Sequence, residues 1–424
     1  MNESNPVVII LFLLQIGVML AVGLIFGQLM RKIHQPAVLG ELIGGIILGP
    51  TIFGALLPGP YRQLFPGFPE TVEAREVIIR IGMLFFMFVA GLEVNLAQLG
   101  QRKKSILLVS ILGCVLPFAL GAGSVYLFPA VWQSSSTTVD TNFVLFIGIA
   151  LSISALPVIT RILMDLNLLQ REFGGIAITS AAINDLLGWS LFALLLNSLN
   201  SGSLDNSFLR TVGVILLVGV VVLGIGRFAG RIVFRWARNA LPWPSGFLGV
   251  TAVFIFISAA IAETLQIHAI FGAFLIGVAL IPVFEQNEAD HAREIIYQFA
   301  VSFFAPLYFV AVGLKADFAA NFDVGLVLLV IAVAIVGKIT GAAVGARISG
   351  IDVKDSLAIG FTMNARGAME MILASVALEF GLIDQRIFVA LVTMALVTSM
   401  MSGPLLQWLL KREKSAVVVP VSAE

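Results

Sequence analysis

The amino-acid sequence predicts an all-α protein that crosses a membrane many times. Hydrophobic residues make up 59% of its 424 residues and charged residues only 12%, whereas a soluble domain carries about 25% charged residues. Apolar segments long enough to cross a bilayer as helices recur along the whole chain. Nearly all of the chain is therefore expected to lie in lipid.

We expect about thirteen transmembrane helices, because that many apolar runs approach the length of about 20 residues that a spanning helix needs. No basic residue precedes the first run. We therefore expect a spanning helix there and not a cleaved signal peptide. The runs cover residues 6–30, 37–56, 76–98, 105–128, 142–163, 173–199, 208–234, 246–265, 267–284, 295–313, 324–346, 355–380 and 386–410.

The distribution of basic residues predicts the orientation of the helices. One set of connections is basic, as at residues 102–104, and the alternate set, as at 131–141 and 200–207, contains no lysine or arginine. The positive-inside rule places the amino terminus outside and the carboxyl terminus in the cytoplasm. We expect the cell (inner) membrane as the location, and no soluble regulatory domain after the last run.

Several classes of function are disfavoured by composition. The net charge is zero and no long charged tail is present, so no nucleic-acid partner is expected. Cys114 is the only cysteine and lies in an apolar run, which excludes an intrachain disulfide and a thiolate metal cluster. We find no nucleophile–base pair and no nucleotide-binding motif, and expect neither an enzyme nor a cofactor.

Two of the apolar runs contain residues that interrupt a helix. The fifth contains Pro157, and the twelfth contains Asn364 and Arg366. Backbone groups freed by such residues are tolerated at membrane depth only where protein or water satisfies them. The two runs lie seven helices apart and so cross in opposite directions, which is typical of inverted-repeat transporters. The simpler alternative is a proline kink and a local Asn364–Arg366 pairing.

Asp185 lies near the centre of the sixth run, where a charged side chain costs about 2.5–3.5 kcal/mol and usually serves ion or proton movement. A carboxylate holds either a monovalent cation or a proton, and competition for it would couple the two flows. The adjacent Asn184 is also a candidate for the ion site, but adjacent helix positions do not share a face, so we expect it to brace the crossing more than to ligate directly. Ser152 and Ser154 are candidates to complete the oxygen shell of the cation, unless they bond back to their own helix.

Two further ionisable residues, Lys338 and Arg366, fall near mid-membrane, and Glu370 lies one turn beyond Arg366. Buried charges of both signs need partners, so we expect these side chains to meet in the core. Lys338 is either a proton carrier or a fixed charge that compensates the dipole ends of the broken helices. The sequence does not separate these two roles.

Seven short motifs together resemble the monovalent cation:proton antiporter superfamily. The resemblance is to its second branch, which includes bacterial sodium/proton antiporters, potassium-efflux antiporters and plant cation/proton exchangers, and it covers nearly the whole chain. The motifs occupy residues 40–50, 88–93, 152–161, 184–185, 304–314, 337–338 and 364–367.

The resemblance implies a homodimeric antiporter in which an ion-transporting core moves against a scaffold, with Asp185 as the carrier. Electrogenic relatives carry two adjacent aspartates, whereas Asn184-Asp185 is the pair of electroneutral ones, yet Lys338 is retained. The stoichiometry therefore stays open. The implied divisions are scaffold at 1–98 and 241–320, core at 99–200 and 321–412, a linker helix at 201–240 and a short cytoplasmic tail at 413–424.

The favoured interpretation is a secondary antiporter that exchanges Na⁺ or K⁺, with Li⁺ as a possible congener, for H⁺. One alternative is a gated cation efflux channel, although no segment resembles a carbonyl-lined selectivity filter. Another is a sodium-coupled symporter of an organic anion, although such apolar helices provide few groups to bind one. The sequence does not distinguish Na⁺ from K⁺.

Overall fold

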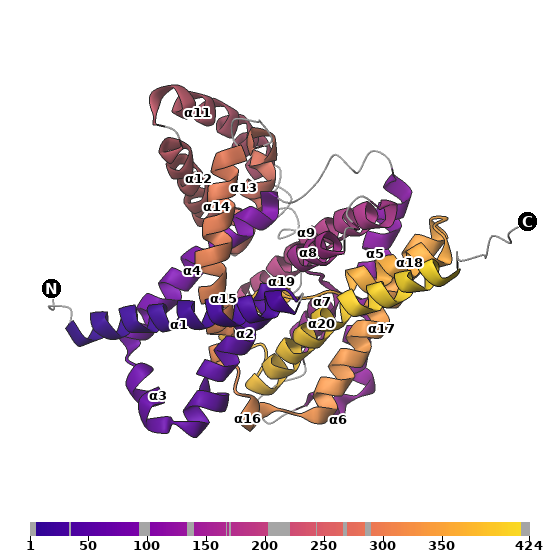
Figure 1. The fold of residues 1–424 in the computed structure, drawn as a ribbon, viewed down its shortest axis with the longest axis horizontal. Helices are drawn as coiled ribbons and strands as arrows, with labels where there is room; N and C mark the ends of the chain where they lie inside the picture. Colours follow the sequence, from indigo (N-terminus) through magenta and orange to yellow (C-terminus); the bar gives the residue numbers. More distant parts are fainter. Residues whose placement is uncertain are drawn as a thin grey trace, which may run out of the picture. The chain divides into compact units, whose positions relative to one another are not determined.

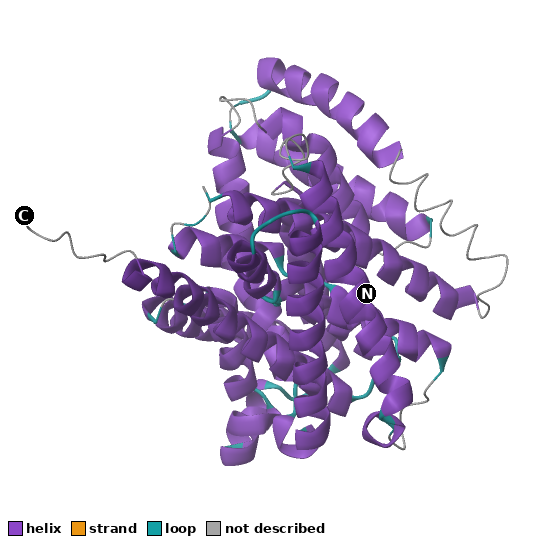
Figure 2. Cartoon of the chain, turned by 90° about the vertical axis from the view of Figure 1, so that its right-hand side faces the viewer, coloured by secondary structure: helices purple, strands orange, loops and turns teal. Residues whose placement is uncertain are grey.

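All regular structure in the described part of the chain is helical (Figures 1 and 2). The predicted all-α class is therefore confirmed. The computed structural model describes residues 6–33, 35–92, 102–133, 140–166, 168, 171–201, 221–242, 244–265, 269–284 and 290–416.

Eight helices in these ranges are long and apolar enough to cross a membrane. Two shorter apolar helices, Thr141–Ser152 and Ala269–Phe284, add to them. Part of the linker helix expected at 208–234, residues 208–220, lies outside the described residues, as does the tail from 417 onward. The multi-pass architecture is confirmed, and the number thirteen stays a prediction.

The chain divides into two compact units, each built from segments distant in sequence. The first comprises Met1–Ile33, Ala37–Val94 and Trp189–Ala320. Within it, α2 packs against α1 and α15, and α13 packs against α4 and α12. Its elements are α1 (Pro6–Lys32), α2 (Ala37–Leu48), η1 (Pro50–Gly54), α3 (Pro58–Leu64), α4 (Pro69–Leu92), η3 (Val222–Gly226), α11 (Arg227–Ala240), α12 (Ser245–Thr264), α13 (Ala269–Phe284), α14 (Asp290–Phe299), η4 (Ala300–Phe304), α15 (Ala305–Lys315) and most of α16 (Phe318–Asn321).

The second unit comprises His34–Pro36, Asn95–Gly188 and Asn321–Glu424. Within it, α17 packs along α5 and also contacts α18 and α20, while α5 contacts α7. This unit carries every candidate site residue predicted from the sequence. Its elements are α5 (Lys103–Leu127), α6 (Pro129–Trp132), α7 (Thr141–Ser152), α8 (Leu156–Asp165), α9 (Glu172–Ser201) as far as Gly188, α17 (Val324–Ile348), α18 (Val353–Met363), α19 (Ala368–Glu379) and α20 (Gln385–Ala416).

Glycines at every fourth position let α17 approach α5 closely. A Cβ atom added at Gly345 would lie 2.5 Å from the carbonyl oxygen of Leu108, and one at Gly341 would clash with the carbonyl oxygen of Leu112. Helices in lipid gain no hydrophobic energy from association, so they depend on such close packing of small residues. The two glycines therefore determine the distance between the two backbones.

We predict that Gly341→Ala destabilises the protein by about 1–3 kcal/mol, the usual cost of overpacking. The new methyl group would push α17 away from the rigid backbone of α5. The matched control is Gly17→Ala on α1, because nothing lies within 4 Å of a Cβ atom built there. Melting temperatures in detergent provide the measurement, and equal values for the two variants would contradict the prediction.

Asp323 joins three elements at one end of the second unit. As the N-cap residue of α17 it accepts a hydrogen bond from the Leu326 N–H at 3.0 Å. It also accepts from Arg386 Nη1 at 2.9 Å, and Arg386 Nη2 donates to the carbonyl oxygen of Trp132 at 2.9 Å. The starts of α17 and α20 are thereby tied to the end of α6.

This arrangement generates a pH prediction. The Leu326 N–H, and after it the Arg386 guanidinium, hold the pKa of Asp323 below its usual value of 3.8 against the opposing effect of desolvation. A depressed folded-state pKa stabilises the fold above the unfolded pKa, and that contribution is lost as the pH falls through the folded value. As the pH is lowered, the melting temperature is expected to fall less steeply for Asp323→Asn than for the parent. Parallel curves would exclude a role for this carboxylate.

Candidate functional site

Two interrupted helices meet within the second unit. The chain leaves α7 at Ser152 and enters α8 at Leu156, and it leaves α18 at Met363 and enters α19 at Ala368. The two breaks are hydrogen-bonded to each other, since the Ala155 N–H donates to the carbonyl of Ala365 at 3.0 Å.

Both interruptions fall close to the residues that predicted them. The first break comes just before Pro157, which is the second residue of α8. The N–H groups in the first turn of a helix have no partner within it, so a proline there costs no helical hydrogen bond. Asn364 follows the last residue of α18 directly and caps its C-terminus. The Ser154 hydroxyl donates to the Met363 carbonyl at 3.1 Å, which adds a side-chain link across the breaks.

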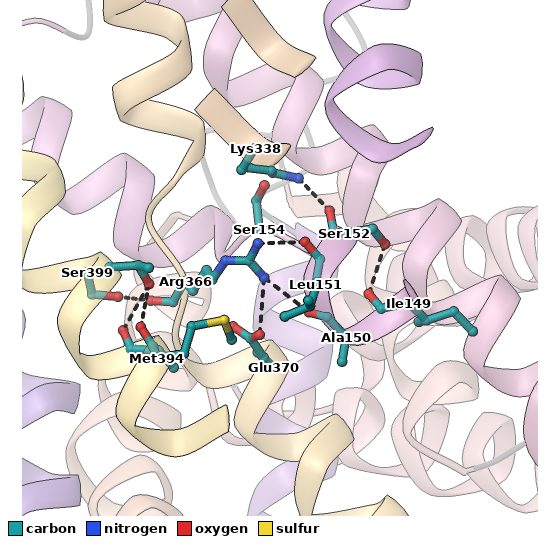
Figure 3. Close-up of polar contacts among 12 residues, drawn as sticks. Ile149, Ala150, Leu151, Ser152, Ser154, Lys338, Arg366, Glu370, Met394 and Ser399 are labelled. Atoms are coloured by element: carbon teal, nitrogen blue, oxygen red, sulfur yellow. Dashed lines mark hydrogen bonds and ion pairs between the residues drawn. The ribbon is translucent and has the colours of Figure 1, made fainter. Parts of the chain in front are cut away.

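Arg366 neutralises the end of α7. Its guanidinium donates from Nη1 to the Ala150 carbonyl at 3.1 Å and from Nη2 to the Leu151 carbonyl at 2.5 Å (Figure 3). Carbonyls in the last turn of a helix have no intrahelical partner and carry the negative end of the helix dipole. A buried cation there satisfies both requirements.

Glu370 balances the charge of Arg366. The Glu370 carboxylate lies 3.1 Å from Arg366 Nη1, and both side chains are almost fully buried. The hydroxyl of Ser399 on α20 donates to the Arg366 carbonyl (Figure 3). Arg366 and Glu370, which were predicted to balance charge in the core, thus form a local ion pair between residues one helical turn apart.

Lys338 extends from α17 and is also fully buried. Its Nζ donates to the carbonyl oxygens of Gly113 at 2.8 Å and of Ser152 at 2.5 Å; Figure 3 shows the second contact. The Ser152 carbonyl is at the end of α7, directly after the two carbonyls that Arg366 binds.

The Asn184 amide lies beside Lys338. With its oxygen facing Lys338 Nζ, the oxygen accepts from that ammonium at 3.0 Å and the amide nitrogen donates to the Ser110 carbonyl at 2.8 Å. The opposite orientation would direct the amide nitrogen at another donor, so the hydrogen-bond network determines the assignment. Asn184 therefore braces α9 against α17 and α5.

Asp185 differs from its charged neighbours because it has no partner of its own. Its side chain is fully buried, and neither carboxylate oxygen accepts a hydrogen bond from any group in the described part of the chain. It lies near the Leu156 N–H, at the positive end of α8, and within electrostatic range of Lys338. Among the four ionisable residues of the site, Asp185 is the one whose charge is least compensated.

The serines and Asn364 contribute in different ways. The Ser152 hydroxyl bonds back to the Ile149 carbonyl of its own helix at 2.8 Å, which is the alternative that the sequence left open. Asn364 is fully buried, and neither polar atom of its side chain has a partner among the described residues. The sequence marked Asn364 only as a helix break. The carbonyls of Ser110 and Gly113 were missed altogether, since any residue type has a carbonyl.

Interrupted helices that meet beside buried ionisable side chains are typical of inverted-repeat secondary transporters. A family model described as "Sodium/hydrogen exchanger, transmembrane" matches residues 9–412, and the chain belongs to this family. The family resemblance inferred from the motifs is thereby confirmed.

Relatives with high coverage agree with this assignment. Cation/H(+) antiporter 18 of Arabidopsis thaliana is 33% identical over 97% of this chain. Na(+)/H(+) antiporter NhaS4 of Synechocystis is 31% identical over 94% of this chain and 96% of its own length. The chain spans about half the length of several relatives, 51% for the Arabidopsis protein.

A solved structure shows the same fold. The sodium proton antiporter MjNhaP1 of Methanocaldococcus jannaschii superimposes with a TM-score of 0.64, and the match covers 97% of this chain and 100% of that one at 14% sequence identity. The predicted sodium/proton antiporter fold is confirmed.

The hydrogen bonds of Asn184 predict a loss of stability in Asn184→Leu. The apolar side chain fills a similar volume but leaves one hydrogen of the Lys338 ammonium without an acceptor, at a cost of about 1–2 kcal/mol. Ser152→Ala is the control, because it removes a hydroxyl from the same site and keeps the Ser152 carbonyl that Lys338 binds. If both variants melt at the same temperature in detergent, the bridging role of Asn184 is wrong.

Proposed function

We propose that this protein is a secondary antiporter that exchanges a monovalent cation, Na⁺ or K⁺, for H⁺ across a membrane. Asp185 alternately holds the cation and the proton. The observation that carries the proposal is a fully buried carboxylate with both oxygens unpaired. The names of its relatives, Na⁺/H⁺, K⁺/H⁺ and cation/H⁺ antiporters, support the same activity.

Physical chemistry explains why such a carboxylate couples two flows. An uncompensated charge in a low-dielectric interior is unfavourable. A proton or a monovalent cation removes that charge, and each excludes the other from the same oxygens. Movement of the site across the membrane is therefore favoured when either ion is bound and disfavoured when the site is empty. This difference is the condition for exchange.

Neutral oxygens beside Asp185 complete the proposed cation site. Ser154 and Asn364 lie on the two breaks, and the Ser154 hydroxyl oxygen keeps lone pairs after donating its proton. The hydroxyl of Ser152 is a further candidate. The oxygen of Asn184 is already used by Lys338, which favours a bracing role for Asn184 over ligation of the ion.

The two compact units suggest a division of labour. The second unit contains all the site residues, so we assign it the role of the moving ion-transport core. The first unit serves as the scaffold and forms a homodimer in the lipid. The basic connections favour a cytoplasmic carboxyl terminus in the cell membrane, and a role in pH homeostasis follows from exchange of H⁺.

We predict that Asp185→Asn abolishes exchange, because an amide neither titrates nor supplies negative charge to a cation. Purified protein in liposomes with an internal pH dye is challenged with Na⁺, K⁺ and Li⁺ in turn. The control is Asp140→Asn, which makes the same chemical change at the exposed N-cap of α7, where asparagine caps equally well.

The outcomes separate the competing functions. Cation-dependent proton movement in the parent and in Asp140→Asn, but not in Asp185→Asn, supports the antiporter. Exchange by Asp185→Asn at the rate of the parent would contradict it. Unitary current steps in a planar bilayer would indicate a channel instead, and cation-driven uptake of an organic acid would indicate a symporter.

A further inference from the structure

We infer that α11, together with the η3 segment before it, forms a binding site for an anionic phospholipid on the cytoplasmic side of the membrane. The site belongs to the first unit and shares no residue with the ion site. Four arginines of α11, at positions 227, 231, 235 and 238, supply its positive charge. Exposed apolar side chains on the same helical segment supply the contacts for the acyl chains.

The side chains of α11 form three faces. The first is buried and consists of Gly230, Phe234 and Ala237; the Phe234 ring packs against Phe247 of α12 with the ring centroids 4.4 Å apart. The second face carries the arginines, which are all exposed and follow one another at intervals of three or four residues. Residues at this spacing are neighbours on a helix surface. The arginines therefore form one continuous basic stripe.

The third face is apolar and exposed. Its side chains are between 53% and 68% exposed and comprise Ile225, Phe228, Ile232 and Trp236. They recur about one turn apart, so an apolar stripe runs beside the basic stripe. A helix with cationic residues beside exposed apolar ones is suited to contact a lipid headgroup and its acyl chains together. Tryptophan, as at Trp236, is a residue type that prefers the membrane–water interface.

The packing of η3 and α11 against α13 indicates the depth of the arginines. A Cβ atom added at Gly226 would lie 2.7 Å from the Ile276 side chain, and one at Gly230 would clash with Leu280. Both contacts advance by four residues, so α11 runs beside α13 in the same direction. The basic stripe therefore begins beside the apolar α13 and extends along the helix axis for about 16 Å.

Exposed arginines at this depth need an anionic partner. None of Arg227, Arg231 and Arg235 forms an ion pair with a carboxylate in the described part of the chain. A charged side chain that faces acyl chains is unfavourable, and a long one extends toward the headgroups instead. Phosphate oxygens there accept paired hydrogen bonds from a guanidinium. The positive-inside rule places this arginine-rich end in the cytoplasmic leaflet, where anionic lipids attract basic segments.

The apolar stripe favours a lipid over other anionic partners. A free phosphate ion would neutralise the arginines but leave Phe228 and Ile232 uncovered. A second copy of this chain, bound through the same face about a two-fold axis, would bring the two basic stripes together. Like charges in contact oppose such an interface. A phospholipid satisfies both stripes, because its phosphate and its acyl chains are joined in one molecule.

The test measures lipid binding to the purified chain in a neutral detergent. Dioleoylphosphatidylglycerol, dioleoylphosphatidylcholine and inorganic phosphate are titrated separately, and native mass spectrometry and the melting temperature report binding. The variant is Arg231→Gln/Arg235→Gln. The control is Lys103→Gln/Lys104→Gln, which removes two charges from the exposed start of α5. We expect phosphatidylglycerol to bind the parent and the control alike. Its affinity for the arginine variant should fall about 25-fold, about fivefold for each charge removed.

Several outcomes would overturn the lipid site. Equal affinity of phosphatidylglycerol for the parent and the arginine variant is one, and equal losses in the arginine and lysine variants, which would indicate a general effect of surface charge, are another. Equal binding of phosphatidylcholine would exclude recognition of the anionic headgroup. Stabilisation by inorganic phosphate alone would indicate a soluble anion as the ligand.

Two further measurements complete the test. A change of oligomeric state in the arginine variant without added lipid would indicate an interface between copies and contradict the lipid site. If the arginine variant does not fold, Trp236→Ala replaces it, since this change keeps all four charges and removes one exposed apolar contact. We expect weaker binding of phosphatidylglycerol to this variant, and an unchanged affinity would overturn the lipid site.

Discussion

The organisation of the site follows from one constraint: a helix that ends inside a membrane exposes backbone groups that water cannot reach. Three successive carbonyls close α7, and all three accept hydrogen bonds from buried cations. Arg366 binds those of Ala150 and Leu151, and Lys338 binds that of Ser152. The two basic side chains thus replace the solvent that would otherwise cover the end of α7.

The opposite end of the break explains the position of the acid. α8 begins at Leu156 and directs the positive end of its dipole toward Asp185. The two cations lie at the negative end of the α7 dipole, and the carboxylate lies near the positive end of the α8 dipole. Each charge is therefore opposite in sign to the helix end that it faces. The basic residues are held by several hydrogen bonds each, whereas the carboxylate has none. The proposed function assigns the exchangeable ion to this carboxylate.

Much of this arrangement could be predicted from the sequence because membrane depth makes polar residues conspicuous. Asp185, Lys338, Arg366 and Glu370 stand out in apolar runs, and Pro157 indicates one of the breaks. The broken, crossing helices are present as predicted. The roles assigned to the site residues are not decided by the fold and stay predictions.

Other features were beyond prediction for physical reasons. Backbone carbonyls of Ser110 and Gly113 have no sequence signature, so their contacts with Asn184 and Lys338 could not be foreseen. Ser152 was predicted from its hydroxyl, yet its carbonyl makes the contact with Lys338. Asn184 could be paired with Lys338 only when the distances between their atoms were known.

The glycines on α17 also determine how Lys338 reaches α5. Gly341 and Gly345 lie one turn apart on the face of α17 that meets α5, and a side chain at either position would overlap the Leu112 or Leu108 carbonyl. Because the two backbones approach this closely, the Lys338 ammonium of α17 lies 2.8 Å from the Gly113 carbonyl of α5. A larger residue at either glycine would therefore act at a distance, because separating the two helices would lengthen the contact of a lysine that the new side chain does not touch.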